Sequence, residues 1–234
     1  MKLACIGVLA VALLAGAGCA NLTTEDGRPR IGDPIRGFNE AMFTVNDKLH
    51  LWVVEPVGTG WASVIPKNAR LRVRDFFNNL DMPRRMLNAF LQGDLRGGGV
   101  ELARFGINTT VGVLGLWDFA TRWDFLQRDE DFGQTFAVWG SGPGPYLVIP
   151  LVGPSSVRDG LGKVLDMACT ISVVIPGAGV LDRVNHVSLH LGEYEAFKDD
   201  ALDPYVAMRN AWFQNRLHLI RNEAADRGDM PPVP

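Results

Sequence analysis

Two histidines have the spacing that a metal site on a helix requires. His186 and His190 are four residues apart, so both rings could face one ion if the segment is helical. Glu193 and Glu195 follow them, but Gly192 intervenes and no third ligand is convincingly spaced. We therefore interpret the histidines as solvated helix residues, and the sequence predicts neither a metal site nor a cofactor.

Side chains that could serve catalysis occur in two short clusters. Asp129, Glu130 and Asp131 could act as general acid and base, although such a run is more typical of a solvated turn. Ser155 and Ser156 lie where a helix N-cap is expected, and no histidine near them in sequence could activate a nucleophile. The chain also lacks the nucleophile-elbow, Walker A, zinc-protease and paired-cysteine motifs, so we predict that it is not an enzyme.

The first 18 residues have the pattern of a secretory signal peptide. Lys2 precedes an apolar stretch from Leu3 to Leu14, which is too short to span a bilayer, and small residues follow. Cys19 comes next, as in a bacterial lipobox, whose cysteine is acylated with diacylglycerol and palmitate. Gly16 stands where a lipobox usually has leucine, so an ordinary cleaved signal peptide is the alternative. We predict a signal peptide over residues 1–18 and lipidation of Cys19.

The rest of the chain divides into a tether, one domain and a tail. Ala20 replaces the aspartate that favours inner-membrane retention in such lipoproteins, which indicates the outer membrane. Residues 19–32 are polar and form the predicted lipidated tether, and residues 226–234 form a predicted disordered tail. Residues 33–225 lack any run of 18 apolar residues, so we expect a single domain without an ordinary transmembrane helix.

One segment has an unusual charge for this chain. The 234 residues have a net charge of −3 and are 47% hydrophobic, which argues against disorder and against general nucleic-acid binding. Residues 67–96 nevertheless hold seven basic and three acidic side chains. A solvated face and pairing with the acidic stretch 182–234 are two interpretations of this cluster; contact with anionic headgroups or a partner is the third. The residues that would make such a contact are Lys67, Arg70, Arg72, Arg74, Arg84 and Arg85.

Apolar residues at spacings of three and four predict helices over much of the chain. The first has Asp33 as its N-cap and Pro34 at its first position, and it ends before Pro56. Further helices are expected at 66–80, at a short stretch starting from residue 83, and at 100–110, 161–175, 180–191 and 204–224. Glycines 97–99 should interrupt the chain, and residues 146–152 read as a strand or a buried loop. Periodicity alone favours an ordinary helical core over a membrane-interface protein.

Glycine and proline are concentrated just before residue 146, in a segment that predicts a defined irregular loop. At membrane depth its free backbone groups would have to face protein or water, which suits the wall of a polar pathway. A rigid surface turn is equally consistent with the sequence. The residues of the loop are Trp139, Gly140, Gly142, Pro143, Gly144, Pro145 and Tyr146.

Several motifs resemble those of the MlaA (VacJ) lipoproteins, over roughly residues 33–217. The resemblance includes Gly37-Phe38-Asn39, residues 128–135 (RDEDFGQT), the glycine–proline loop and Gly153-Pro154-Ser155-Ser156. Phe76 to Leu80, Leu91 to Gly93, and Asp203-Pro204-Tyr205 continue it. The region around 165–195 diverges from the family pattern.

The resemblance implies a mainly α fold of amphipathic helices. These would form a ring embedded in the membrane interface, with an amphipathic channel shaped by the glycine–proline loop and by the first helix, which carries Phe38 and Asn39. It also implies a function: an outer-membrane lipoprotein, anchored on the periplasmic side, that removes mislocalised phospholipid from the outer leaflet and maintains lipid asymmetry. The implied partners are phospholipids, a trimeric porin and a periplasmic carrier of the MlaC type, with no nucleic acid. The alternative is a lipoprotein that scaffolds porins without moving lipid.

Overall fold

The computed structural model describes residues 33–221. The predicted signal peptide, Cys19, the tether and the tail lie outside the described residues. The elements are α2 (Arg36–Leu49), η1 (His50–Val54), α3 (Glu55–Val64), α4 (Lys67–Leu91), α5 (Leu95–Thr110), α6 (Phe119–Arg122), α7 (Phe132–Val138), β1 (Tyr146–Ile149), β2 (Gly153–Ser156), α8 (Val157–Cys169), η2 (Ile171–Val174), α9 (Ala178–Leu189), α10 (Glu193–Asp199) and α11 (Pro204–Ile220). The expected mainly α fold is therefore confirmed.

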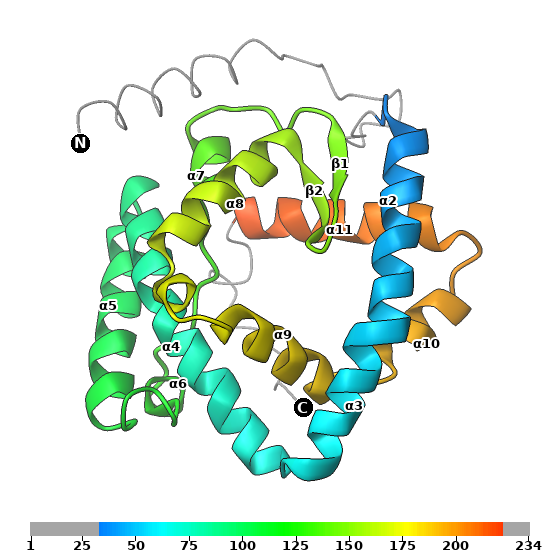
Figure 1. Cartoon of the computed structure of the whole chain (residues 1–234). Coiled ribbons are helices and arrows are strands. Elements are labelled where there is room, and N and C mark those ends of the chain that lie inside the picture. Colours follow the sequence, from blue (N-terminus) through cyan, green and yellow to red (C-terminus); the bar gives the residue numbers. More distant parts are fainter. Residues whose placement is uncertain (1–32, 222–234) are drawn as a thin grey trace.

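The helices are arranged as a ring around a central space (Figure 1). Helices α2 and α3 form one side of the ring, and α4 and α5 pack against each other on the opposite side. Helices α7 and α8 and the hairpin formed by β1 and β2 close the ring. Helix α9 packs on α3 and α4, and α11 contacts α7 and β2. The ring-like architecture implied by the family resemblance is thus present.

The first predicted helix is longer than expected and starts differently. Asp33 does not cap it: α2 begins at Arg36 after Ile35, and the Asp33 carboxylate instead accepts hydrogen bonds from Asn39 and Tyr205. The helical segment also does not end before Pro56. It continues from α2 through the π-helical turn η1 into α3, which contains Pro56. Pro56 lies in the first turn of α3, directly after the π turn, where a missing N–H is tolerated.

Two expected interruptions lie inside helices. Pro83 was expected to start a new helix but lies within the 25-residue α4, where Arg85 donates to the carbonyl of Asn78 at 2.9 Å. Glycines 97–99 belong to α5, whose N-cap Asp94 accepts from the Gly97 N–H. A Cβ on Gly98 would lie 2.3 Å from the Phe90 ring, so glycine lets α5 approach α4 closely. Packing between the two helices outweighs the local signals.

The segment at 146–152 contains a strand. β1 pairs antiparallel with β2, with Tyr146 opposite Ser156 and Ile149 opposite Gly153. Asn39 of α2 is fully buried and binds β1 twice, donating to the Tyr146 carbonyl at 3.0 Å and accepting from the Val148 N–H at 2.9 Å. The main apolar cluster lies here, and its residues are Tyr146, Val148, Tyr205, Met42, Phe43, Val206 and Trp212.

The distribution of polar and apolar side chains differs from that of an ordinary helical core. Among the side chains that the structure describes, 18 buried ones are polar or charged and only nine are hydrophobic. Large hydrophobic side chains are instead widely exposed, including Trp52 at 72%, Leu95 at 74% and Val64 at 76%. Because contiguous exposed apolar surface marks an interaction site, the periodicity-based preference for an ordinary core is wrong. No helix in the described part of the chain is long and apolar enough to cross a membrane.

Candidate functional site

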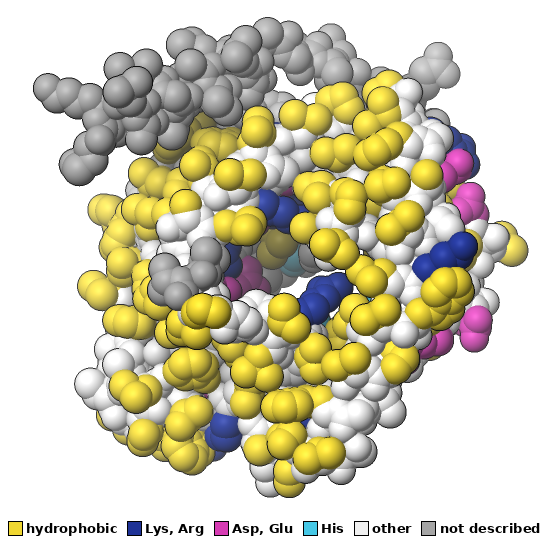
Figure 2. All heavy atoms as spheres, viewed as in Figure 1, with side chains coloured by type: hydrophobic (Ala, Val, Ile, Leu, Met, Phe, Trp, Pro, Cys, Tyr) yellow, Lys and Arg dark blue, Asp and Glu magenta, His cyan; other side chains and the backbone are white. Residues whose placement is uncertain are grey.

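The ring has a polar hollow within an apolar face. Figure 2 shows hydrophobic side chains over most of this face and around the central hollow. Basic, acidic and histidine side chains are visible inside the hollow. This arrangement separates a polar passage from an apolar exterior, which is the separation that a molecule with a polar head and apolar chains requires.

A cavity of about 570 Å³ lies between α2–η1–α3, the turn of the hairpin and α9. Ten of its thirteen lining residues are apolar or glycine: Leu49, Val53, Val54, Val57, Leu151, Val152, Gly153, Gly179, Val180 and Val184. The other three are Asn46, His50 and Arg183. Its size is in the range of small-molecule sites, and its lining is mostly apolar.

The three polar residues of this cavity differ in what they already bind. Asn46 uses both ends of its amide on the hairpin turn, donating to the Ile149 carbonyl and accepting from the Leu151 N–H. Burial, and next the charge of Arg183, lower the pKa of His50, whose ring packs 4.5 Å from that of Tyr194. Arg183 is exposed and makes no hydrogen bond or ion pair within residues 33–221. The cavity therefore holds one cation without a partner among the described residues.

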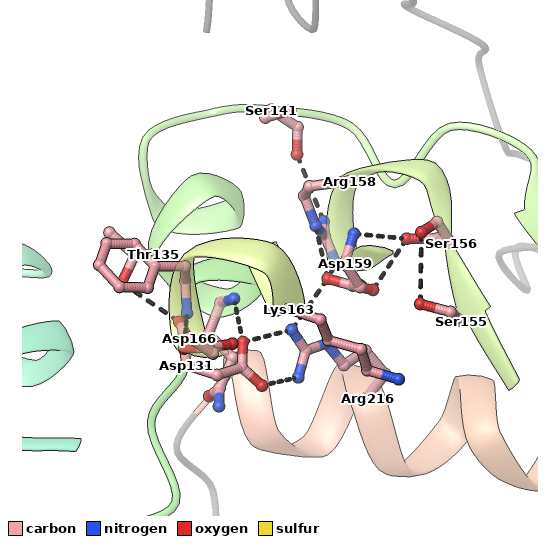
Figure 3. Close-up of polar contacts among 12 residues, drawn as sticks. Asp131, Thr135, Ser141, Ser155, Ser156, Arg158, Asp159, Lys163, Asp166 and Arg216 are labelled. Atoms are coloured by element: carbon pink, nitrogen blue, oxygen red, sulfur yellow. Dashed lines mark hydrogen bonds and ion pairs between the residues drawn. The ribbon is translucent and has the colours of Figure 1, made fainter. Parts of the chain in front are cut away.

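A second polar region, the ionic corner, joins α7, α8 and α11 and consists of Asp131, Arg158, Asp159 and Arg216 (Figure 3). Arg216 donates to both oxygens of Asp131 at 2.6 Å and to Asp159 at 2.8 Å. Arg158 pairs with Asp159, which also accepts from the Ser156 hydroxyl at 2.8 Å. Burial acts to raise the pKa of Asp131, but the hydrogen bonds and charge of Arg216 outweigh it and lower the pKa. Because these groups pair with one another, the ionic corner has a structural role: it connects α7, α8 and α11.

Three further ionisable groups lie near the ionic corner, of which Glu130 is buried and Asp166 and Lys163 are partly buried. Burial raises the pKa of Glu130 to about 7 and that of Asp166 to about 6, the latter despite the nearby Arg84. Burial, and then the neighbouring Arg216, lower the pKa of Lys163. The acidic run 129–131 is therefore not a solvated turn, because Glu130 is 1% exposed and Asp131 caps α7 by accepting from Gln134.

One of the two serines caps a helix, as the sequence indicated, and the two histidines are exposed in the last turn of α9 and at its C-cap. Ser156 is the N-cap of α8 and accepts from the Asp159 N–H. His186 and His190 stack with ring centroids 4.5 Å apart, and His190 contacts the His186 carbonyl. No cluster of three or more metal-binding side chains occurs in the described part of the chain.

The glycine–proline loop follows α7 and leads into β1. Gly140 and Gly144 have positive φ values of 91° and 67°, a backbone conformation that residues other than glycine rarely adopt. Trp139 is exposed and donates from its indole to the Leu91 carbonyl, whereas Tyr146 is buried in the apolar cluster. Phe38 is half exposed on α2. Asn39, expected beside a channel, instead holds the hairpin from a fully buried position.

The basic cluster is paired mainly within its own neighbourhood. Arg85 is 1% exposed and pairs with Glu101 of α5, so it lacks the access that headgroup contact requires. Arg84 pairs with Asp81 and Asp166, and Arg72 and Arg74 both pair with Asp75. Arg70 donates to the carbonyls of Ile65 and Ser188. Lys67 is exposed and has no hydrogen bond or ion pair within residues 33–221.

One buried ionic group was not anticipated from the sequence. Arg104 pairs with Asp118 and lies 3.9 Å from Glu101, which in turn holds Arg85. Glu101 and Arg104 are three residues apart on α5, a spacing visible in sequence, but their burial depends on the packing of α4 against α5. The sequence of the predicted helix 180–191 also did not indicate that Arg183 would line a cavity.

Comparison with known proteins gives consistent matches. Residues 31–219 match the family model described as MlaA lipoprotein. The chain is 34% identical over 240 residues to the intermembrane phospholipid transport system lipoprotein MlaA of Escherichia coli (strain K12), covering 97% of this chain and 91% of that protein. The protein of the same name from Haemophilus influenzae is 30% identical, covering 92% and 90%.

A solved structure is also similar to this fold. It comes from work on the structural basis for maintenance of bacterial outer membrane lipid asymmetry, and its TM-score is 0.71 at 30% identity. The match covers 81% of this chain and 99% of that chain, so it includes the greater part of the ring described above.

Proposed function

The chain belongs to the MlaA lipoprotein family, and from this premise we propose that it removes mislocalised phospholipid from the outer leaflet of the outer membrane. The relatives are named as lipoproteins of an intermembrane phospholipid transport system, and the similar structure concerns outer-membrane lipid asymmetry. In this role the chain passes lipid toward the periplasm and so maintains the asymmetry.

The observation that carries this function is the polar hollow inside an apolar ring. Exposed Trp, Val and Leu side chains on the outside stabilise contact with acyl chains, while the hollow offers polar surroundings to a headgroup. A phospholipid could then move its headgroup through the ring while its chains stay in apolar surroundings.

Membrane attachment would come from lipidation of Cys19, with the body on the periplasmic side of the outer membrane. A single acyl chain binds membranes only marginally, so a diacylated cysteine plus the exposed apolar face would together give stable attachment. The exposed part of the glycine–proline loop, from Trp139 to Pro145, would form part of the passage wall, whereas Tyr146 lies buried in the apolar cluster. Of the six basic residues predicted to contact headgroups or a partner, the exposed Lys67 and the half-exposed Arg74 are the most accessible.

The proposed partners are a trimeric porin in the outer membrane and a soluble periplasmic carrier of the MlaC type. The carrier would accept lipid from the periplasmic opening, and the direction of movement would depend on that carrier. The chain itself catalyses no bond cleavage in this role, because Ser155 and Ser156 are buried at the start of α8 and the acidic groups beside them are paired.

The test is lipid transfer to the carrier. Purified lipidated protein is inserted into vesicles of labelled phospholipid, and the label that appears on the soluble carrier is counted. We expect transfer that depends on the protein and falls when Gly140 and Gly144 are replaced by bulky residues. Gly99, where a Cβ would meet nothing within 4 Å, provides a control substitution outside the loop.

Each other outcome has a distinct meaning. Partner capture with intact, untransferred lipid, despite a functional carrier and correct insertion, would favour a porin scaffold. Cleaved lipid would indicate an enzyme and would contradict both roles.

A further inference from the structure

We propose that the cavity between α2, η1 and α9 is a phospholipid-binding site in which Arg183 pairs with the lipid phosphate and the valines contact an acyl chain. This inference rests on the proposed function, because it names how the transported lipid is recognised. The cavity has a volume of about 570 Å³, so it holds part of the lipid while the remainder extends into the hollow or the membrane.

The charge of Arg183 is the first argument. Most other arginines of the described chain have ion-pair or carbonyl partners, and several of them, such as Arg84 and Arg216, each pair with two carboxylates. Arg183 lines the cavity with no hydrogen bond or ion pair among residues 33–221, and its neighbour Asp182 is not within ion-pair distance. A cation facing a mostly apolar wall is complementary to an anion that arrives with apolar chains.

The remaining polar groups of the cavity give no comparable anchor. Asn46 has its amide fully engaged by the hairpin turn. The lowered pKa of His50 favours the neutral ring, which adds no second positive charge. The cavity therefore offers one positive charge beside eight apolar side chains. A free phosphate would leave that apolar wall unused, and an uncharged lipid would leave Arg183 unpaired.

The space beside Arg183 is open. Gly179 lies one helical turn earlier on α9 and lines the same cavity, and a Cβ built on it would meet nothing within 4 Å. A group of headgroup size can therefore approach Arg183 without displacing α9. The same geometry allows the space to be filled by substitution without a clash in the fold.

Binding by the full-length lipidated protein in detergent tests the proposal. The probes are a short-chain phosphatidylglycerol, a diacylglycerol with the same chains, and inorganic phosphate. We expect Arg183→Gln to weaken phosphatidylglycerol binding about tenfold, the effect of one charge-assisted phosphate contact, and to leave diacylglycerol binding unchanged. Arg183→Lys should retain most of the affinity. The matched control is Arg96→Gln, which removes an exposed cation of α5 that has no hydrogen bond or ion pair within residues 33–221.

A second variant tests the space rather than the charge. Gly179→Leu should weaken phosphatidylglycerol and diacylglycerol alike while the melting temperature stays at or above that of the wild type. Unchanged phosphatidylglycerol affinity in either Arg183→Gln or Gly179→Leu would overturn the site and leave the transport function standing. If the wild type bound inorganic phosphate as tightly as phosphatidylglycerol and Arg183→Gln abolished that binding, the phospholipid site would also be overturned, because the cavity would be a simple anion site. Failure of the wild type both to bind and to transfer phospholipid would count against the proposed function itself.

Discussion

In the ionic corner, Arg216 is enclosed by the carboxylates of Asp131 and Asp159, whereas Arg183 on the cavity wall has no ion-pair partner within residues 33–221. The side chain of Arg216 is 10% exposed, and its charge is compensated by the buried Asp159 and the partly buried Asp131. Arg183 is exposed, and solvent or a ligand must complete its hydrogen bonds. The two positions show that the same residue type braces one region and remains available in the other.

Glycines show the same contrast between the two regions. Gly162 of α8 lies against the backbone of Gly133 in α7, so that a Cβ would be 2.4 Å from the Gly133 nitrogen. Gly179 of α9 faces open space. The corner is packed at backbone distance and the cavity wall is not, which is what a rigid support and a binding surface respectively require.

The largest expected effect comes from removing the corner arginine. Arg216→Met leaves Asp131 and Asp159 without their shared guanidinium, and we expect a loss of about 3–5 kcal/mol in the free energy of unfolding. Arg183→Met should change it by no more than about 0.5 kcal/mol. Urea unfolding of both variants in the same detergent measures the difference. Equal losses would show that the corner is no more structural than the cavity wall.

The second effect concerns packing of the corner. Gly162→Ala places a Cβ against backbone atoms that cannot rotate away, and we expect the free energy of unfolding to fall by about 3 kcal/mol. The control is Gly106→Ala in α5, where a Cβ meets nothing within 4 Å and helix propensity favours alanine. A lower melting temperature for Gly162→Ala alone is the expected result. If both variants melt alike, the close approach of α7 and α8 does not limit the structure.

Local signals in the sequence predicted several elements well. Ser156 was expected as a helix N-cap and is one, and the helix expected from Pro204 begins there as α11. Those signals succeed because a cap and an N-terminal proline act on adjacent backbone groups. The ring was implied only by resemblance to the family, since helical periodicity does not specify how helices meet.

The remaining features depend on contacts between distant segments. The continuation of α4 past Pro83 and of α5 through glycines 97–99 follows from packing of the two helices. Asp131 and Arg216 are 85 residues apart in sequence, and no local pattern pairs them. That Arg183 lines a cavity without an ion-pair partner within residues 33–221 could be recognised only from the folded structure. Sequence therefore predicted the elements better than the candidate site.

The third effect is the pH dependence of the region beside the corner. Burial raises the pKa of Glu130 from 4.5 to about 7 in the folded protein. The contribution of this carboxyl to stability is therefore fully present below its pKa in the unfolded chain and is lost as pH rises through about 7. Glu130→Gln removes this titration. We expect the variant to gain about 1–2 kcal/mol relative to wild type between about pH 5 and about pH 8. Urea midpoints across that range measure the gain, and Glu193→Gln, at an exposed carboxyl of α10, should follow the wild type. A constant difference for Glu130→Gln would show that this carboxyl does not titrate there.

The smallest effect tests whether the cavity wall is as open as the corner is closed. Gly179→Ala adds a methyl group that meets no atom within 4 Å, and it reduces the conformational freedom of the unfolded chain. We expect a gain of about 0.4–1 kcal/mol, opposite in sign to Gly162→Ala, measured by urea unfolding in the same detergent. Phosphatidylglycerol binding should persist, because a methyl group fills little of a cavity of about 570 Å³. A loss of stability at Gly179 would mean that the wall is packed against a neighbour, and the space assigned to the headgroup would then belong to the fold.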